Sequence, residues 1–343
     1  MQKILLSVTM VAAAAAGSAS SARAISYRVV DLTPTGFVAG VGVDLSVYGE
    51  VGIGFTKDTR AHALLWRGTA ASCVDLSPAG FINSYAESIY ANQQAGYGQM
   101  TSEEIHALLW NGTAKSVVGL NPNGFVESYA FGTNGEQQVG YGIPPDSSAF
   151  HALIWNGTAA SAMDLNPVGF ISSEAEDIAG DEISGFGMTA NDDVLHALVW
   201  TGTAASAVDL NPSGFVSSQA YGTDGKQQVG YGMPIHSTFE HALLWSGTAA
   251  SAVDLNPYGY IDSHAVGNNA TQQVGYGTPI DSGYEHALLW SGTAESCLDL
   301  QQFLPVEFVQ SQANSINAIG VIFGYATAKN GKRHVIAWVP TAQ

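Results

Sequence analysis

Short runs of apolar residues, separated by glycine and polar turn residues, recur along the whole chain at a nearly constant interval. The most regular run, His-Ala-Leu-Leu-Trp at 62–66, returns with small changes at 106–110, 151–155, 196–200, 241–245 and 286–290, and a more divergent copy occupies 334–338. These seven copies, about 45 residues apart, contain all seven Trp residues of the chain. The runs are too short for helices and lack helical periodicity, so the pattern predicts an all-β repeat protein.

The unit between residues 208 and 255 shows how one copy is built. Turn-forming Asn, Asp, Pro and Gly alternate with four short segments of apolar or small residues. We expect strands at Ser218–Thr223, Gln228–Gly232, His241–Trp245 and Ser251–Leu255, tight turns at Asp224-Gly225 and Ser246–Ala249, and a variable loop at Met233–Glu240. Four strands in about 45 residues is typical of one blade of a β-propeller.

The last copy supplies three of these strands but no fourth, because the chain stops soon after Trp338. The segment Tyr27–Leu32, followed by Thr-Pro-Thr-Gly-Phe, matches the fourth strand and the next turn of the other copies. An open solenoid would instead need atypical capping repeats. We therefore predict one domain over residues 25–343: a closed seven-bladed β-propeller in which the N-terminal strand pairs with His334–Val339 and completes the last blade.

The first 24 residues have the features of a secretory signal peptide. Lys3 precedes an apolar stretch that is too short to span a bilayer, and Ala22-Arg23-Ala24 forms an A-x-A cleavage site. No other apolar run approaches membrane length. The sequence thus predicts a secreted or periplasmic protein without membrane insertion.

The charge balance narrows the classes of partner. The chain has 29 acidic residues against 11 basic ones, a net charge of −18, and loss of residues 1–24 would remove two more positive charges. Such a surface repels nucleic acid and anionic membranes, and it suits cationic ligands or Ca²⁺. Cys73 and Cys297 occupy the same position in two different copies. We expect them not to bond to each other, and we expect a monomer.

The repeat resembles the HAF-type extracellular repeat family. The resemblance lies in His-Ala-Leu-Leu-Trp, in the Asp-Leu that follows it, and in the Gly-x-Asn/Asp-Gly-x-x-x-Val-Gly-Tyr hairpin, and it covers nearly all of residues 27–338. This chain has Leu where the family has Phe, and Asn-Pro-x-Gly where the family usually has Gly-Thr-Leu-Gly-Gly. The resemblance implies a secreted bacterial protein, and it implies no activity.

The repeated His and Trp residues are better explained by architecture than by chemistry. If the hairpin after each Trp is centred on its four turn residues, Leu64 faces Cys73 and His62 faces Asp75. The same register pairs most of the other repeated His with an Asp, although blade 2 has Gly119 there. A His–Asp pair can hold strand ends in register. One Trp per copy can fill the space between packed blades.

Positions at which the copies differ are better candidates for binding. The loops between second and third strands vary most, and we expect them on the same face as the Asn-Pro-x-Gly turns. Their acidic residues include Glu103, Glu104, Asp146, Asp192, Asp193, Asp281 and Glu285. A second variable position lies between a shared Ser and a shared Ala, at the start of the innermost strand and near the mouth of the central channel. It is occupied by Val41 in the first blade and by the candidate ligand-binding residues Tyr85, Tyr129, Glu174, Gln219, His264 and Gln312 in the others.

Known catalytic motifs are absent from the sequence, so we identify no catalytic residue, no metal ligand and no cofactor. Asp192-Asp193 could contribute to a Ca²⁺ site but lacks a full ligand set. The sequence favours a secreted binding or interaction module for an extracellular glycan or protein. The alternative is a polysaccharide lyase or hydrolase with its site among the long loops.

Overall fold

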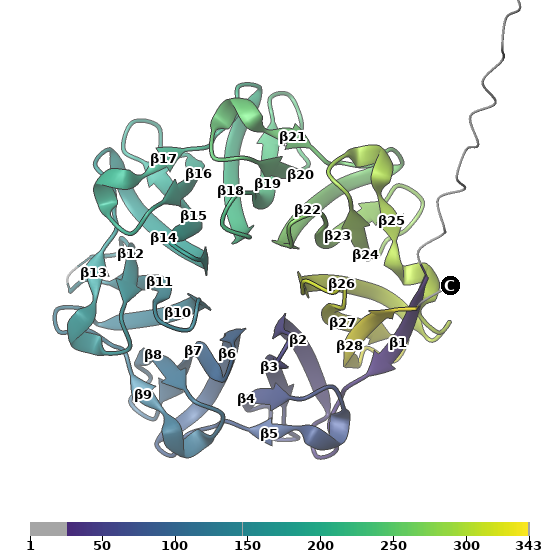
Figure 1. Cartoon of the computed structure of the whole chain (residues 1–343), viewed down its shortest axis with the longest axis horizontal. Helices are drawn as coiled ribbons and strands as arrows, with labels where there is room; N and C mark the ends of the chain where they lie inside the picture. The colour runs from purple at the N-terminus through teal and green to yellow at the C-terminus, as the bar shows by residue number, and fades with distance from the viewer. Residues whose placement is uncertain (1–25, 146, 342–343) are drawn as a thin grey trace, which may run out of the picture.

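The computed structural model describes residues 26–145 and 147–341. Seven four-stranded antiparallel sheets are arranged as blades around a central channel, which confirms the predicted seven-bladed β-propeller (Figure 1). The predicted signal peptide at 1–24 lies outside the described residues. Within the described part of the chain, no helix has the length and apolar character needed to cross a membrane.

Each blade runs from an inner to an outer strand. Blade 1 consists of β2 (Ala39–Ser46), β3 (Gly49–Phe55), β4 (Ala61–Trp66) and β5 (Val74–Asp75). Blade 2 consists of β6 (Phe81–Tyr90), β7 (Gln93–Met100), β8 (Ile105–Trp110) and β9 (Val118–Gly119). Blade 3 consists of β10 (Glu127–Thr133), β11 (Gln138–Ile143), β12 (His151–Trp155) and β13 (Met163–Asp164). Blade 4 consists of β14 (Phe170–Ala179), β15 (Glu182–Thr189), β16 (Leu195–Trp200) and β17 (Val208–Asp209).

The remaining blades repeat this order. Blade 5 consists of β18 (Phe215–Thr223), β19 (Gln228–Pro234), β20 (His241–Trp245) and β21 (Val253–Asp254). Blade 6 consists of β22 (Tyr260–Asn268), β23 (Gln273–Pro279), β24 (His286–Trp290) and β25 (Leu298–Asp299). Blade 7 consists of β26 (Phe308–Ile316), β27 (Ile322–Ala328), β28 (Arg333–Pro340) and β1 (Tyr27–Asp31). Short 3₁₀ helices lie at η1 (Ala70–Ser72), η2 (Ala114–Ser116), η3 (Ala159–Ser161), η4 (Ala204–Ser206), η5 (Ala249–Ser251), η6 (Ala294–Ser296) and η7 (Leu300–Phe303).

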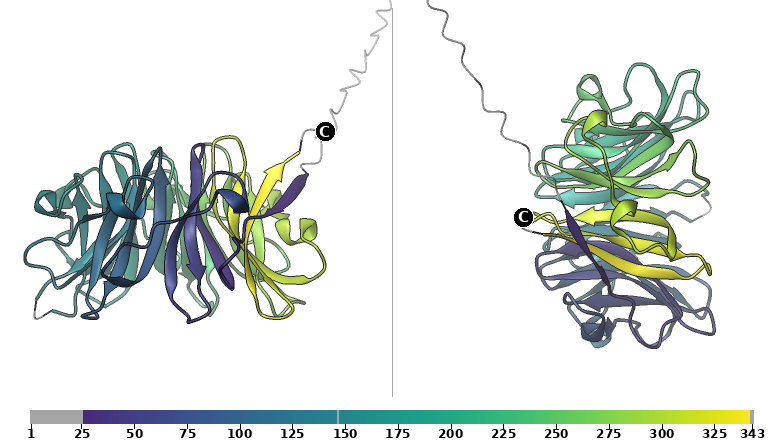
Figure 2. Two further views of the ribbon diagram at one scale, coloured as in Figure 1. Left: turned by 90° about the horizontal axis from the view of Figure 1, so that it is seen from below. Right: turned by 90° about the vertical axis from the view of Figure 1, so that its right-hand side faces the viewer.

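The ring is closed by the N-terminal strand, as the sequence predicts. Strand β1 pairs antiparallel with β28 from Tyr27 opposite Pro340 to Asp31 opposite Ile336. The side view shows β1 crossing the outer edge of blade 7 (Figure 2). Leu32, directly after β1, is 1% exposed, and its backbone amide donates to the Val335 carbonyl at 2.8 Å. The two ends of the chain therefore share one blade and leave no blade incomplete.

The repeated Trp residues fill the spaces between blades, which confirms the structural interpretation. All seven are at most 1% exposed. Trp110 of blade 2, for example, packs against Val51, Ala63 and Leu65 of blade 1. Three of the indoles also donate across the interface, one of them from Trp245 Nε1 to the Leu210 carbonyl at 2.9 Å. Burial of one large aromatic side chain per interface contributes several kcal/mol, on the order of 2–3 for each.

The predicted register of the outer hairpin is wrong by two residues. Leu64 lies opposite Asp75 rather than opposite Cys73, and the fourth strand has only two residues, as at Val253–Asp254 instead of Ser251–Leu255. The reason is the 3₁₀ helix that lengthens the turn. In blade 1, Ser72 Oγ accepts from the Arg67 amide at 2.8 Å and donates to the Thr69 carbonyl at 2.6 Å. The serine that recurs here in the first six copies thus fixes a wider turn than four residues would form.

Candidate functional site

The two faces of the ring carry different connections. The loops between second and third strands contact the Asn-Pro-x-Gly turns, as where the Ile235 amide donates to the Gly214 carbonyl at 2.8 Å. The prediction that these two sets share a face is therefore confirmed, and we call it the long-loop face. The opposite face carries the hairpins between first and second strands and the 3₁₀ turns, and we call it the tight-turn face.

The candidate binding residues lie on the innermost strands, but not at their start. Each stands between a buried Ser and a buried Ala, as Tyr85 does between Ser84 and Ala86. Because side chains alternate along a strand, these residues face the channel. Tyr85 is the fifth residue of β6 and Gln312 the fifth of β26, so the expected position at the channel mouth is corrected to mid-strand. The cause is that the inner strands begin earlier than the sequence pattern suggests.

Carboxylates from the long-loop face hold several of these side chains in place. His264 Nε2 and Glu240 Oε2 are 2.8 Å apart, and Gln312 Nε2 donates to Glu285 Oε2 at 2.6 Å. Tyr129 donates its hydroxyl proton to Glu127 at 3.0 Å. The loop acid Glu285 and the inner-strand residue Gln312 therefore belong to one site, although the sequence treats them as separate sets.

Aromatic rings from the second strands line the channel beside these residues. They come from the Tyr or Phe that follows a shared Gly in the second strand, at Tyr97, Tyr141, Phe186, Tyr231, Tyr276 and Tyr325. Tyr85 stacks on Tyr97 with ring centroids 4.7 Å apart, and Tyr231 lies 4.3 Å from the His264 ring. Because these aromatic residues recur in nearly every copy, the sequence indicates a structural role for them and does not identify them as residues of the site.

Below this level, towards the tight-turn face, the channel widens into a cavity of about 470 Å³. We call it the central cavity. All seven blades line it, and of the six candidate residues only Gln312 does so. Its lining comes largely from the position two residues further along each inner strand, which is occupied by Val43, Glu87, Phe131, Glu176, Tyr221, Val266 and Asn314. This position also varies from copy to copy, which is the signal that could have identified it.

Carboxyl groups give the central cavity its electrostatic character. Asp44, Glu87, Glu176 and Asp177 line it, and none of its lining residues is Lys, Arg or His. Burial, reinforced by the nearby Asp44 carboxylate, raises the pKa of Glu87 from 4.5 to about 7. Burial likewise raises the pKa of Asp177 from 3.8 to about 6. At neutral pH the cavity therefore carries negative charge that no cationic side chain of its lining offsets.

The acidic side chains of the channel differ in how many hydrogen bonds they accept from the rest of the protein. Asp44 accepts from Ser315 Oγ at 2.7 Å and from the Ile89 amide at 2.9 Å, and it thereby links blade 1 to both neighbouring blades. Asp177 accepts from the Thr223 amide of the next blade at 2.9 Å. Glu87 accepts no hydrogen bond from any described residue. The hydrogen bonds of Asp44 and Asp177 therefore join neighbouring blades, whereas Glu87 is available to a ligand.

Glu174 and Glu176 lie on the same strand, β14, and face the channel together. Burial raises the pKa of Glu174 to about 7. Burial, followed by the charge of Glu174, raises the pKa of Glu176 well above its usual value. Because the two carboxyls stand two residues apart on one strand in a buried environment, they do not both ionise readily near neutral pH. A cation placed between these groups and Glu87 would be stabilised by all three.

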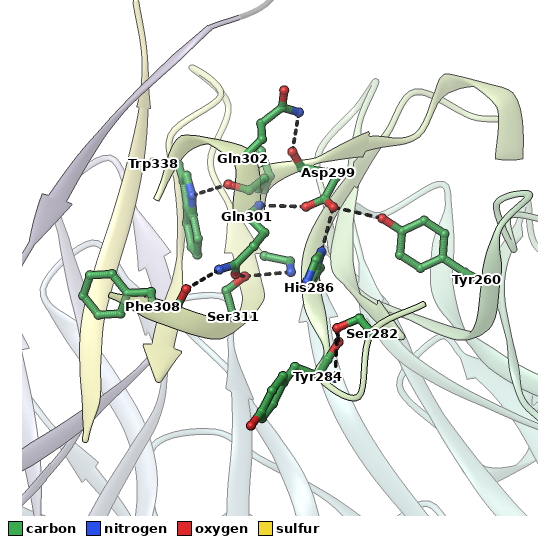
Figure 3. A network of polar contacts seen from close by, with 12 residues as sticks. Tyr260, Ser282, Tyr284, His286, Asp299, Gln301, Gln302, Phe308, Ser311 and Trp338 are labelled. Carbon is green, nitrogen blue, oxygen red and sulfur yellow. Dashed lines mark hydrogen bonds and ion pairs between the residues drawn. The ribbon is translucent and has the colours of Figure 1, made fainter. Parts of the chain in front are cut away.

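The repeated His–Asp pairs form a separate network in each blade. In blade 6, His286 Nδ1 is 2.7 Å from Asp299, which also accepts from the Tyr260 hydroxyl and from the Gln301 amide (Figure 3). Six of the repeated His are paired in this way, all with Nδ1–Oδ2 distances of 2.7 or 2.8 Å. In blade 2, where Gly119 replaces Asp, the closest carboxylate to His106 is Glu104 at 3.9 Å.

These pairs do not converge on one site, since each belongs to a different blade. Among residues 26–145 and 147–341, no three His, Cys, Asp or Glu side chains gather closely enough to hold a metal ion. Asp192 and Asp193 are part of that described region. Cys73 and Cys297 are both free thiols and do not bond to each other, as predicted. The groups with available chemistry are therefore those of the central channel.

Comparison with known proteins identifies the fold and nothing finer. No family model and no curated protein matches the chain, so its resemblance to HAF-type repeats stays a prediction. The β-propeller domain of the Trilobed protease from Pyrococcus furiosus is similar in structure, with a TM-score of 0.58 and 10% identity over 88% of this chain and 94% of that one.

Two further solved structures belong to proteins of quite different kinds. An oligogalacturonate lyase in complex with manganese matches with a TM-score of 0.58 and 8% identity, over 92% of this chain and 96% of that one. The BP39L lectin from Burkholderia pseudomallei matches with a TM-score of 0.51 and 12% identity, over 93% of this chain and 96% of that one. A protease domain, a lyase and a lectin share this fold, so function has to be argued from the site.

Proposed function

We propose that this protein is an extracellular binding module that takes an organic cation, a ligand with a protonated amine or quaternary ammonium group, into the central cavity. The observation that carries the proposal is the lining of that cavity. It combines Glu87 and Glu176 with the rings of Phe131, Tyr221 and Tyr276, and it contains no cationic side chain. Its volume of about 470 Å³ lies within the range of small-molecule sites.

An organic cation fits this lining better than a metal ion does. Ca²⁺ needs six to eight oxygen ligands close together, whereas the described residues hold no group of three potential ligands. An ammonium group gains from spaced carboxylates and from the faces of aromatic rings, and such cation–π contacts contribute about 0.5–2 kcal/mol each. Burial, followed by the charge of neighbouring acids, raises the pKa values of Glu87 and Glu176, and a bound cation would favour their ionised forms.

The alternative function, that of an extracellular polysaccharide lyase or hydrolase, gains no support from the channel acids. Hydrolysis of a glycosidic bond by two carboxyl groups needs them about 5–9.5 Å apart. Glu174 and Glu176 stand two residues apart on the same strand, β14, and so approach a ligand in the channel from the same side. Their arrangement suits a bound cation rather than an acid and a nucleophile on either side of a sugar.

The test is a binding titration with choline and putrescine, set against glucose and Ca²⁺, on the wild type and on a variant with a blocked cavity. Val266→Trp would fill the cavity, and Val168→Trp, at a fully exposed position, is its control. Glu87→Gln removes charge without adding bulk. We expect at least one cation to bind to the wild type and to Val168→Trp, and to bind at least about tenfold more weakly to the other two variants. If neither cation binds, or if Val266→Trp binds as the wild type does, the proposal is wrong.

A further inference from the structure

A groove lies on the tight-turn face, outside the site described above. It has a volume of about 1030 Å³ and is formed by the first hairpins of blades 2, 3 and 4 together with the outer turn of blade 2. These hairpins join β6 to β7, β10 to β11 and β14 to β15, and the inner strands β6, β10 and β14 are neighbours around the channel (Figure 1). We call it the hairpin groove.

The hairpin groove and the central cavity are neighbouring spaces. Tyr90 and Ile178 line both of them. A ligand that extends past these two side chains would contact both spaces, and the combined site exceeds what a single monosaccharide or a small amine would fill.

Tyr90 gives the hairpin groove an aromatic surface that the other blades lack. It is 54% exposed, which is unusual for a ring at the end of an inner strand. The other six blades have smaller side chains at this position, namely Ser46, Asn134, Ala179, Asp224, Asn269 and Asn317. An exposed tyrosine ring beside polar groups is a suitable surface for stacking against the apolar face of a sugar ring.

The polar walls of the groove present hydrogen-bond acceptors and are held in place by the protein itself. Asn134 donates from Nδ2 to the Gly180 carbonyl at 2.8 Å, which ties the hairpin of blade 3 to that of blade 4. Asn92 accepts from Arg67 at 3.1 Å and donates to Asn111. Glu136 and Asp181, both exposed, line the groove from blades 3 and 4.

We propose that the hairpin groove and the central cavity together bind an oligosaccharide that carries free amino groups, with one ammonium group in the central cavity and the following sugars along the groove. This inference rests on the proposed function, because it needs a cation in the cavity. Carboxylates and amides in the groove match the hydroxyl groups of sugars, and Tyr90 matches a ring face. A neutral glycan would leave the charges of Glu87 and Glu176 unopposed.

The test compares short β-linked oligomers of equal length that differ in one group: glucosamine oligomers, N-acetylglucosamine oligomers and glucose oligomers. Affinity is measured by isothermal titration, with the glucosamine monomer as the small cation. We expect the amino oligomer to bind with a stoichiometry of one and about tenfold more tightly than the monomer and than either neutral oligomer. No gain over the monomer, or equal binding of the neutral oligomers, would overturn the inference.

Groove variants separate this inference from the proposed function. Glu136→Gln and Asp181→Asn should each weaken oligomer binding by up to about fivefold, and Tyr90→Ala by about tenfold, while Glu136→Gln and Asp181→Asn leave monomer binding unchanged. Glu295→Gln, an exposed acid in η6 of blade 6, is the matched control for nonspecific attraction of a cationic chain. If monomer binding is lost in Val266→Trp but no groove variant affects the oligomer, the groove inference fails and the cavity proposal stands. If Val266→Trp leaves monomer binding intact, both fail.

Discussion

Replacing Glu87 with Gln should stabilise the unliganded protein at neutral and alkaline pH. Glu87 accepts no hydrogen bond from the described residues, and burial with the Asp44 charge raises its pKa from 4.5 to about 7. A raised carboxyl pKa means that the folded state holds the proton more tightly than the unfolded state does. Stability due to this group is therefore highest below pH 4.5, decreases as the pH rises towards 7, and stays low above it.

The size of the effect follows from the pKa of Glu87. A pKa that rises from 4.5 to about 7 corresponds to at most about 3.5 kcal/mol, at about 1.4 kcal/mol per pKa unit. Because Glu87 faces the channel and remains partly accessible to solvent, we expect about 1–2 kcal/mol. In a protein of this size that difference shifts the melting temperature by roughly 1.5–3 °C.

The assay is thermal unfolding of the wild type, Glu87→Gln and the control Glu295→Gln at about pH 4.5 and about pH 8. We expect Glu87→Gln to melt above the wild type at the higher pH and close to it at the lower pH, with the control unchanged at both. A variant that melts below the wild type at the higher pH would show that the Glu87 carboxylate is stabilised by groups other than those described, and would refute the reasoning.

Three other predictions follow from the fold. Deletion of residues 26–32 should abolish cooperative melting, because it exposes the edge of β28 and the core around Tyr27; a truncated protein that melts as the intact one does would contradict ring closure. His241→Ala should cost about 1–2 kcal/mol, and His106→Ala, whose histidine has no Asp partner, should cost less; equal losses in urea unfolding would show that the pairs contribute little. Burial raises the pKa of both cysteine thiols to about 12, so mass analysis should find them alkylated slowly at about pH 8 in the native protein and rapidly in denaturant.

The sequence alone determined the architecture of this protein because the repeat carries redundant information. One Trp and one turn pattern per copy define the blade length, and Tyr27–Asp31 can pair only with the blade that lacks a fourth strand. The register of the outer hairpin could not be predicted in this way. Its width depends on hydrogen bonds of Ser72 within a 3₁₀ turn, and a count of residues cannot distinguish that turn from a tighter one.

The sequence also located half of the site. The contrast between shared and variable positions predicted residues such as Tyr85 and His264, which do face the channel. Glu87, Glu176 and Tyr221 also occupy a position that varies among the copies. The sequence does not indicate, however, at which depth along the channel a cavity remains between the side chains. That depends on how rings from neighbouring blades pack, as Tyr97 does with Tyr85 of its own blade and Tyr129 of the next.

Only the tertiary structure decided where carboxylates meet. Asp44 and Glu87 are 43 residues apart in the chain, and Glu87 and Glu176 are 89 apart. They line one cavity because ring closure brings three different blades around one axis. The hairpin groove likewise adjoins that cavity only because the fold places Tyr90 and Ile178 in the lining of both. Local periodicity determines each blade, whereas the geometry of the ring determines which side chains share a space and therefore what the protein can bind.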